Sequence, residues 1–114
     1  MKLYYQDDFI ENYSEDKSVQ SNYNNTSYVF DIDNTSVQRF RLDFDNLKQD
    51  SVILQSITLS RKHKEVILKG DDLKDFIMFP LSIEAELLND KSLLLKINNK
   101  EDPYLVSKNL NLLW

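Results

Sequence analysis

The most regular pattern of hydrophobic and polar positions lies between residues 37 and 59. Its first half alternates with a period of two, as a half-buried strand requires. Its second half is rich in β-branched and long aliphatic residues, and residues 45–51 between the halves have the composition of a turn. We therefore predict a β-hairpin whose first strand divides into an apolar face and a polar face, namely Phe40, Leu42 and Phe44 against Arg39, Arg41 and Asp43.

Shorter segments with the same period flank this hairpin. Residues 81–88 contain good helix formers, but their alternation favours a strand. Residues 72–76 fit one helical turn with an aspartate cap, although residues 76–79 could equally be a strand. Residues 6–26 fit a long surface loop, which on a β scaffold is either a plain connection or a binding loop. The other predicted strands are residues 3–5, 27–32, 65–68, 93–97, 104–106 and 110–114.

Eight or nine short strands, with turns about every ten residues and no sustained helical stripe, indicate an all-β fold. We predict a single domain over residues 1–114, an antiparallel β-sandwich of jelly-roll type. The chain has only one glycine and two prolines, so asparagine and aspartate are expected to form most turns.

The composition narrows the classes of function. The chain has no cysteine, which excludes disulfides, thiolate catalysis and cysteine-bound zinc. A net charge of -5 argues against binding to nucleic acid. We find no run of 18 apolar residues and no basic-then-apolar start, so we expect no direct membrane insertion, and the bacterial cytoplasm in preference to export for this chain.

Catalytic and metal-binding patterns are weak. His63 is the only histidine, which argues against a Ser-His or Cys-His nucleophile, and no pair of acids marks a hydrolytic cleft. Basic residues 61–64 could contact an anion, but they fit the solvated end of a hairpin better. Four oxygen-bearing residues could hold calcium, although their spacing does not match a known calcium loop: Asp43, Asp45, Asn46 and Asp50. We therefore expect no enzyme activity, no cofactor and no metal.

Polar and aromatic side chains give a better signal for a ligand. Arg41 and Asp43 share a strand face, where a guanidinium and a carboxylate could bind sugar hydroxyls. The structural alternative is that Asp43 and Asp102 fix turns and that Arg41 pairs with one of them. Aromatic rings stack on the apolar faces of sugars. Tyr4 and Tyr5 must point to opposite faces of their strand, so one of them is expected to face outward, unless all the aromatics belong to the core or its rim.

Four short segments carry a resemblance to a known family. They are residues 4–16, which contain Tyr4-Tyr5, Phe9 and Ser14-Glu15-Asp16; residues 40–43, Phe-Arg-Leu-Asp; residues 54–59, Leu-Gln-Ser-Ile-Thr-Leu; and residues 102–105, Asp-Pro-Tyr-Leu. In these segments the chain resembles a β-sandwich accessory module attached to family 2 and rhamnan-synthesis-type glycosyltransferases of bacterial surface-polysaccharide synthesis. It departs from the family pattern at Phe44, where the family has proline.

The resemblance implies a non-catalytic module that binds a glycan or positions a glycosyltransferase partner. The residues expected to form its ligand-binding site are Tyr5, Arg41, Asp43, Asp102, Tyr104 and Trp114. A second hypothesis is a protein-interaction or oligomerisation domain that uses an exposed apolar edge at residues 110–114. A third is an acidic mimic of nucleic acid, which we rank last because acidic and basic residues are interspersed along the chain.

Overall fold

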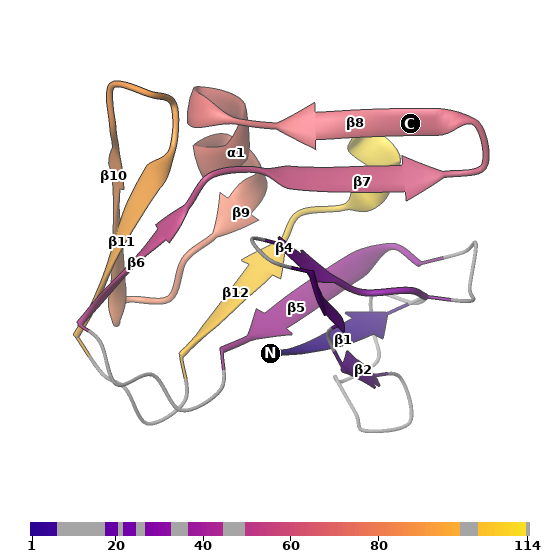
Figure 1. Cartoon of the computed structure of the whole chain (residues 1–114), viewed down its shortest axis with the longest axis horizontal. Helices are drawn as coiled ribbons and strands as arrows, with labels where there is room; N and C mark the ends of the chain where they lie inside the picture. Colours follow the sequence, from indigo (N-terminus) through magenta and orange to yellow (C-terminus); the bar gives the residue numbers. More distant parts are fainter. Residues whose placement is uncertain are drawn as a thin grey trace.

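The computed structural model describes residues 1–6, 18–20, 22–24, 27–32, 37–44, 50–98 and 103–113. Almost all regular structure in these residues is antiparallel β-strand, with a single α-helix, α1 (Gly70–Phe76) (Figure 1). The predicted all-β class is therefore confirmed. Within the described residues, no helix is long and apolar enough to cross a membrane.

The largest sheet has five strands in the order β2-β1-β5-β12-β9. Its central strand β5 pairs antiparallel with β1 on one side and with β12 on the other. The edge strand β9 is short and follows directly after α1. The strands of this sheet are β1 (Lys2–Gln6), β2 (Ser18–Gln20), β5 (Arg39–Asp43), β9 (Ile77–Met78) and β12 (Tyr104–Ser107).

A second sheet has three strands in the order β10-β11-β6, and two further pairs form separate ribbons, β3-β4 and β7-β8. After β12 the chain forms a short 3-10 helix, η2 (Leu110–Leu112). The strands of the three-stranded sheet are β6 (Ser51–Leu54), β10 (Ile83–Leu87) and β11 (Leu93–Ile97). Those of the ribbons are β3 (Asn22–Asn24), β4 (Ser27–Val29), β7 (Ile57–Arg61) and β8 (Lys64–Leu68).

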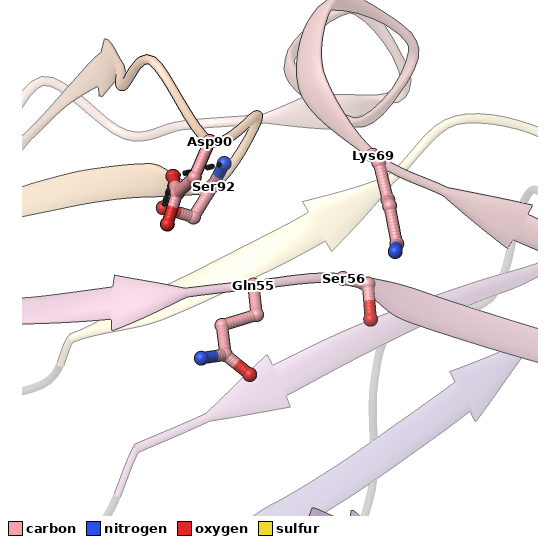
Figure 2. Close-up of a pocket in the computed structure, with 5 residues that line it drawn as sticks. All are labelled: Gln55, Ser56, Lys69, Asp90 and Ser92. Atoms are coloured by element: carbon pink, nitrogen blue, oxygen red, sulfur yellow. Dashed lines mark hydrogen bonds between the residues drawn. The ribbon is translucent and has the colours of Figure 1, made fainter.

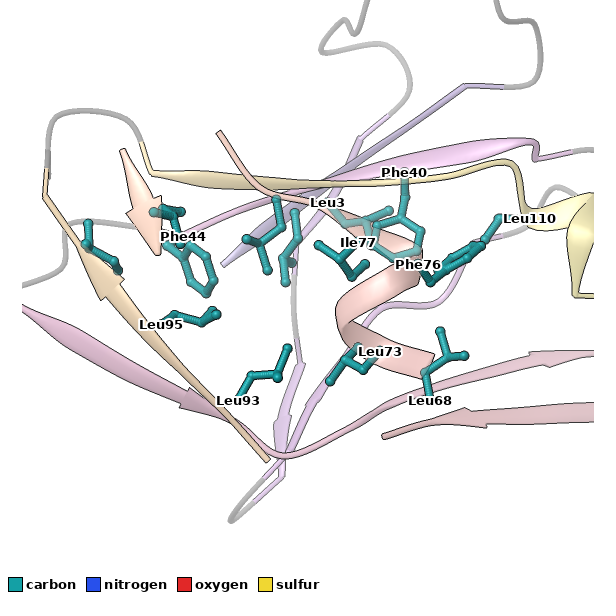
Figure 3. Close-up of a cluster of buried hydrophobic side chains, with 14 residues drawn as sticks. Leu3, Phe40, Phe44, Leu68, Leu73, Phe76, Ile77, Leu93, Leu95 and Leu110 are labelled. Atoms are coloured by element: carbon teal, nitrogen blue, oxygen red, sulfur yellow. The ribbon is translucent and has the colours of Figure 1, made fainter. Parts of the chain in front are cut away.

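The hydrophobic core gathers the inward faces of both sheets and of α1 (Figure 3). The predicted alternation is confirmed in β5 and β11, because every second residue of each strand is buried. Leu73 from α1, Leu93 and Leu95 from β11 and Leu105 from β12 have no exposed surface. Burying a leucine side chain of this kind stabilises the fold by about 1.5–3 kcal/mol relative to leaving it exposed.

The prediction of a hairpin over residues 37–59 is wrong, although both of its arms are strands. Strand β5 pairs with β1 and β12, whereas β6 pairs with β11 in the other sheet. The second arm is also split, because the chain leaves regular strand geometry at Gln55 and Ser56 and continues as β7. The alternating pattern specifies which face of a strand is buried, but not which neighbour supplies its hydrogen bonds.

The prediction of a closing strand at residues 110–114 is also wrong, since residues 110–112 form η2. Asn109 causes this turn, because its side-chain oxygen accepts a hydrogen bond from Asn111 N at 2.9 Å. The helical turn predicted from residue 72 begins at Gly70 and has no side-chain cap. Two short strands, β2 and β3, lie within the region expected to be a loop, and the strand predicted over residues 27–32 ends at Val29.

Candidate functional site

The outward face of the five-stranded sheet holds a cluster of polar and aromatic side chains. Its position follows from the alternation in β5: burying Phe40 and Leu42 forces Arg41 and Asp43 to the other face. The strand register then sets their neighbours. Arg41 lies opposite Tyr4 on β1 and Val106 on β12, while Asp43 lies opposite Lys2 and Tyr104.

Arg41 and Asp43 form a two-point ion pair within β5. Arg41 Nε donates to Asp43 Oδ1 at 2.6 Å, and Arg41 Nη2 donates to Asp43 Oδ2 at 2.9 Å. The side chains are partly buried, with 25% of Arg41 and 16% of Asp43 exposed. Two parallel hydrogen bonds fix the plane of the guanidinium as well as its position.

Two tyrosine rings flank this fixed guanidinium. Arg41 Cζ lies 4.5 Å from the centre of the Tyr104 ring and 5.5 Å from the centre of the Tyr4 ring. Lys2 Nζ lies 5.4 Å from the centre of the same Tyr4 ring. Such cation–π contacts contribute about 0.5–1 kcal/mol at exposed sites. Lys2 and Tyr4 come from β1, Arg41 from β5 and Tyr104 from β12. The cluster therefore also links the three central strands of the sheet.

The structure brings together three of the six residues expected to bind a ligand, Arg41, Asp43 and Tyr104. Tyr5 lies elsewhere, because it pairs with Phe40 and packs against the core. Its neighbour Tyr4 is the outward-facing tyrosine of β1. The alternation of faces could have suggested Tyr4, but only the strand register decides between the two tyrosines.

Asp102 and Trp114 lie outside the described residues, as do Asp45 and Asn46 of the calcium hypothesis. Among the residues that are described, no three His, Cys, Asp or Glu side chains are grouped closely enough to hold a metal ion. The basic segment at residues 61–64 forms the tip of the β7-β8 ribbon, as the sequence predicts. Lys62, His63 and Lys64 are exposed there, in agreement with a solvated hairpin end.

A second polar feature lies where β6 gives way to β7. It is a hollow of about 230 Å³ lined by Gln55, Ser56, Lys69, Asp90 and Ser92 (Figure 2). Ser92 donates two hydrogen bonds to Asp90 Oδ1, from its hydroxyl at 2.5 Å and from its backbone N–H at 3.0 Å. These bonds, first that of the hydroxyl and then that of the backbone, lower the pKa of Asp90 below its usual value of 3.8. The arrangement fixes the predicted turn at residues 89–91.

Comparisons with known proteins found no matching family model, no similar curated protein and no similar solved structure.

Proposed function

We propose that this chain is a non-catalytic carbohydrate-binding accessory module of bacterial surface-polysaccharide synthesis, which serves a glycosyltransferase partner. The observation that carries the proposal is the Arg41 guanidinium, held by Asp43 and stacked on Tyr104 on the outward face of a sheet. A sugar offers an apolar C–H face and a rim of hydroxyls, so a site for it combines an aromatic ring with oriented polar groups.

The proposal includes a finer description of the fold. The buried faces of the five-stranded and three-stranded sheets meet in one hydrophobic cluster. We infer that these two sheets are the layers of an antiparallel β-sandwich of jelly-roll type. In such a module the outward sheet face can present a binding surface while the inward face supplies the core.

Tyr104 is the residue that we assign to stacking. Arg41 comes from β5 and covers one face of the Tyr104 ring, so the other face is turned away from β5. A pyranose ring stacked on that other face lies across the Tyr104 ring from the guanidinium, so a hydroxyl or a neighbouring sugar unit that extends past the ring edge would reach the Arg41–Asp43 pair. Each arginine N–H can donate to a hydroxyl oxygen, and each carboxylate oxygen can accept from a hydroxyl group.

The test is a titration of the isotopically labelled chain, followed by two-dimensional amide NMR. The ligands are rhamnose, galactose, N-acetylglucosamine and short oligomers of each. We expect shifts confined to β5, β12 and the adjacent part of β1. The variant Tyr104→Ala should weaken binding about tenfold or more, because a base stacked on an aromatic side chain gains roughly 1–3 kcal/mol and we expect a similar gain for a sugar ring.

The matched control is Tyr28→Ala, which removes a half-exposed tyrosine from the β3-β4 ribbon. This variant should bind as tightly as the parent chain. If no sugar shifts any peak at millimolar concentration, or if Tyr28→Ala weakens binding as much as Tyr104→Ala, the proposed site is wrong.

A further inference from the structure

The segment from Ser51 to Ser60 contains β6 and most of β7, which are separated by Gln55 and Ser56. It contains no charged residue, no glycine and no proline, in a chain of which 29% is charged. Edge strands of soluble proteins are usually protected by lysine, proline or a short length, because their unpaired backbone groups attract other strands. A long uncharged edge of this kind is therefore suited to pairing with a strand of another chain.

Both strands of this segment are paired along one edge inside the chain. Strand β11 pairs with β6, and β8 pairs with β7. The chain just after β8 also bonds to the chain just before β11, since Gly70 N donates to Lys91 O at 2.8 Å. Strands β11 and β8 therefore lie one after the other along the same edge of the Ser51–Ser60 segment. No described strand pairs with the opposite edge.

The hydrogen-bonding groups of that opposite edge can be assigned. Ile97 N donates to Asp50 O at 2.8 Å, so the backbone groups of residue 50, and by alternation those of Val52 and Leu54, face β11. Those of Ser51 and Ile53 then face the unpaired edge. In β7, the two-residue turn makes Arg61 and Lys64 the closing hydrogen-bonded pair.

The backbone N–H and C=O groups of residues 57 and 59 consequently face β8, and those of Thr58 and Ser60 face the unpaired edge. The four residues whose backbone groups face the unpaired edge are all exposed, and 58% of the Ile53 surface is accessible to solvent. They are Ser51, Ile53, Thr58 and Ser60. They carry their side chains on the outer face of the sheet. Outward positions are odd-numbered up to Gln55 and even-numbered from Ser56 onward, because these two neighbours project from the same side of the segment (Figure 2).

We propose that this edge pairs with the same edge of a second copy of the chain, antiparallel and about a two-fold axis between Gln55 and Ser56. The sequence Ser-Val-Ile-Leu-Gln-Ser-Ile-Thr-Leu-Ser is nearly symmetric about that point. In this register each residue meets one of similar character: Ser51 meets Ser60, Val52 meets Leu59, Ile53 meets Thr58, Leu54 meets Ile57, and Gln55 meets Ser56.

The exposure of the paired positions supports the same register. Directly opposed residues in an antiparallel pair must share a sheet face. Ser51, Ile53, Thr58 and Ser60 are all exposed, whereas Val52, Leu54, Ile57 and Leu59 are all half-buried. The phase change at the centre makes this match feasible, because a regular strand would place opposed residues of this register on opposite faces.

The first test measures the oligomeric state of the whole chain by sedimentation velocity over a range of concentrations. We expect a monomer–dimer equilibrium in the parent chain. Ile53→Lys introduces a charge on the paired edge, and it should raise the dimer dissociation constant about tenfold or more. The matched control is Ile67→Lys on β8, where 54% of the side chain is exposed but the position lies off the paired edge. This control should dimerise like the parent chain.

The second test fixes the register and does not depend on equilibrium affinity. The chain has no cysteine, so the double variant Ile53→Cys with Thr58→Cys carries the only thiols. Five residues along a strand span about 16 Å, too far for a disulfide within one chain, whereas opposed residues of two strands lie about 5.5 Å apart. Oxidation should give a covalent dimer on a non-reducing gel.

A parent chain that stays monomeric at every concentration, together with a double-cysteine variant that fails to cross-link, would overturn the proposal. A dimer that survives Ile53→Lys would equally overturn it, since that dimer must use another surface. Circular dichroism of each variant confirms that the fold is retained. The outcome is separate from sugar binding, because Tyr104 and Arg41 belong to the other sheet.

Discussion

Ser107 provides the sharpest prediction about the stability of this fold. Strands β5 and β12 pair through three consecutive residues, and the next pair along would be Phe40 with Ser107. At that point the backbone N–H of Phe40 donates instead to Ser107 Oγ at 2.9 Å. Ser107 is completely buried and Phe40 is 4% exposed, so water cannot replace this bond.

Ser107→Ala removes the acceptor and leaves the Phe40 N–H buried without a partner. An unsatisfied buried group of this kind costs about 1–3 kcal/mol. For a chain of 114 residues, each kcal/mol lowers the melting temperature by about 4 °C, so we expect a decrease of roughly 4–12 °C. Urea unfolding followed by circular dichroism should show a lower midpoint with an unchanged slope.

The control is Ser82→Ala, which removes the same hydroxyl from a partly exposed position outside both proposed sites. A surface change of this kind should alter the free energy of unfolding by less than about 0.5 kcal/mol. Amide hydrogen exchange of Phe40 gives a local readout, because its exchange should accelerate in Ser107→Ala. Equal stability of the two variants, with Phe40 exchange unchanged, would refute the reasoning that the serine hydroxyl completes the β5–β12 pairing.

Three further changes test other parts of the fold. Gly70→Ala should destabilise the chain by about 1 kcal/mol in thermal unfolding, because Gly70 has φ +58 and an added Cβ would lie 3.4 Å from Lys91 Cβ. Carbon-detected NMR titration should give Asp90 a pKa below 3.8, and this pKa should rise towards 3.8 in Ser92→Ala. Because folding lowers the pKa of Asp90, its contribution to stability is present above pH 3.8 and is lost as the pH falls through the folded pKa. Arg41→Lys should lower the free energy of unfolding by up to about 1 kcal/mol in urea, because lysine keeps the charge but loses the two-point bond and the stacked plane.

Part of the candidate site could be predicted from the sequence because it depends on one local rule. Alternation along residues 37–44 places Arg41 and Asp43 on the same face, and their two-residue spacing lets the side chains meet. Tyr104 also lies on this face. The rule could not choose between Tyr4 and Tyr5, because both alternatives satisfy it. The pairing of Tyr5 with Phe40 makes that choice, since paired residues share a face and Phe40 is buried.

The sequence by itself determined properties that depend on near neighbours in the chain: the strand period and buried face of β5 and β11, and the turns at residues 61–64 and 89–91. The tertiary structure alone decided which strands pair, and so separated β5 from β6 and joined β5 to β1 and β12. It also decided the role of Ser107, whose partner Phe40 is 67 residues away. The physical reason is that backbone hydrogen bonds are chemically alike in every strand, so only the fit of whole apolar faces selects the partner.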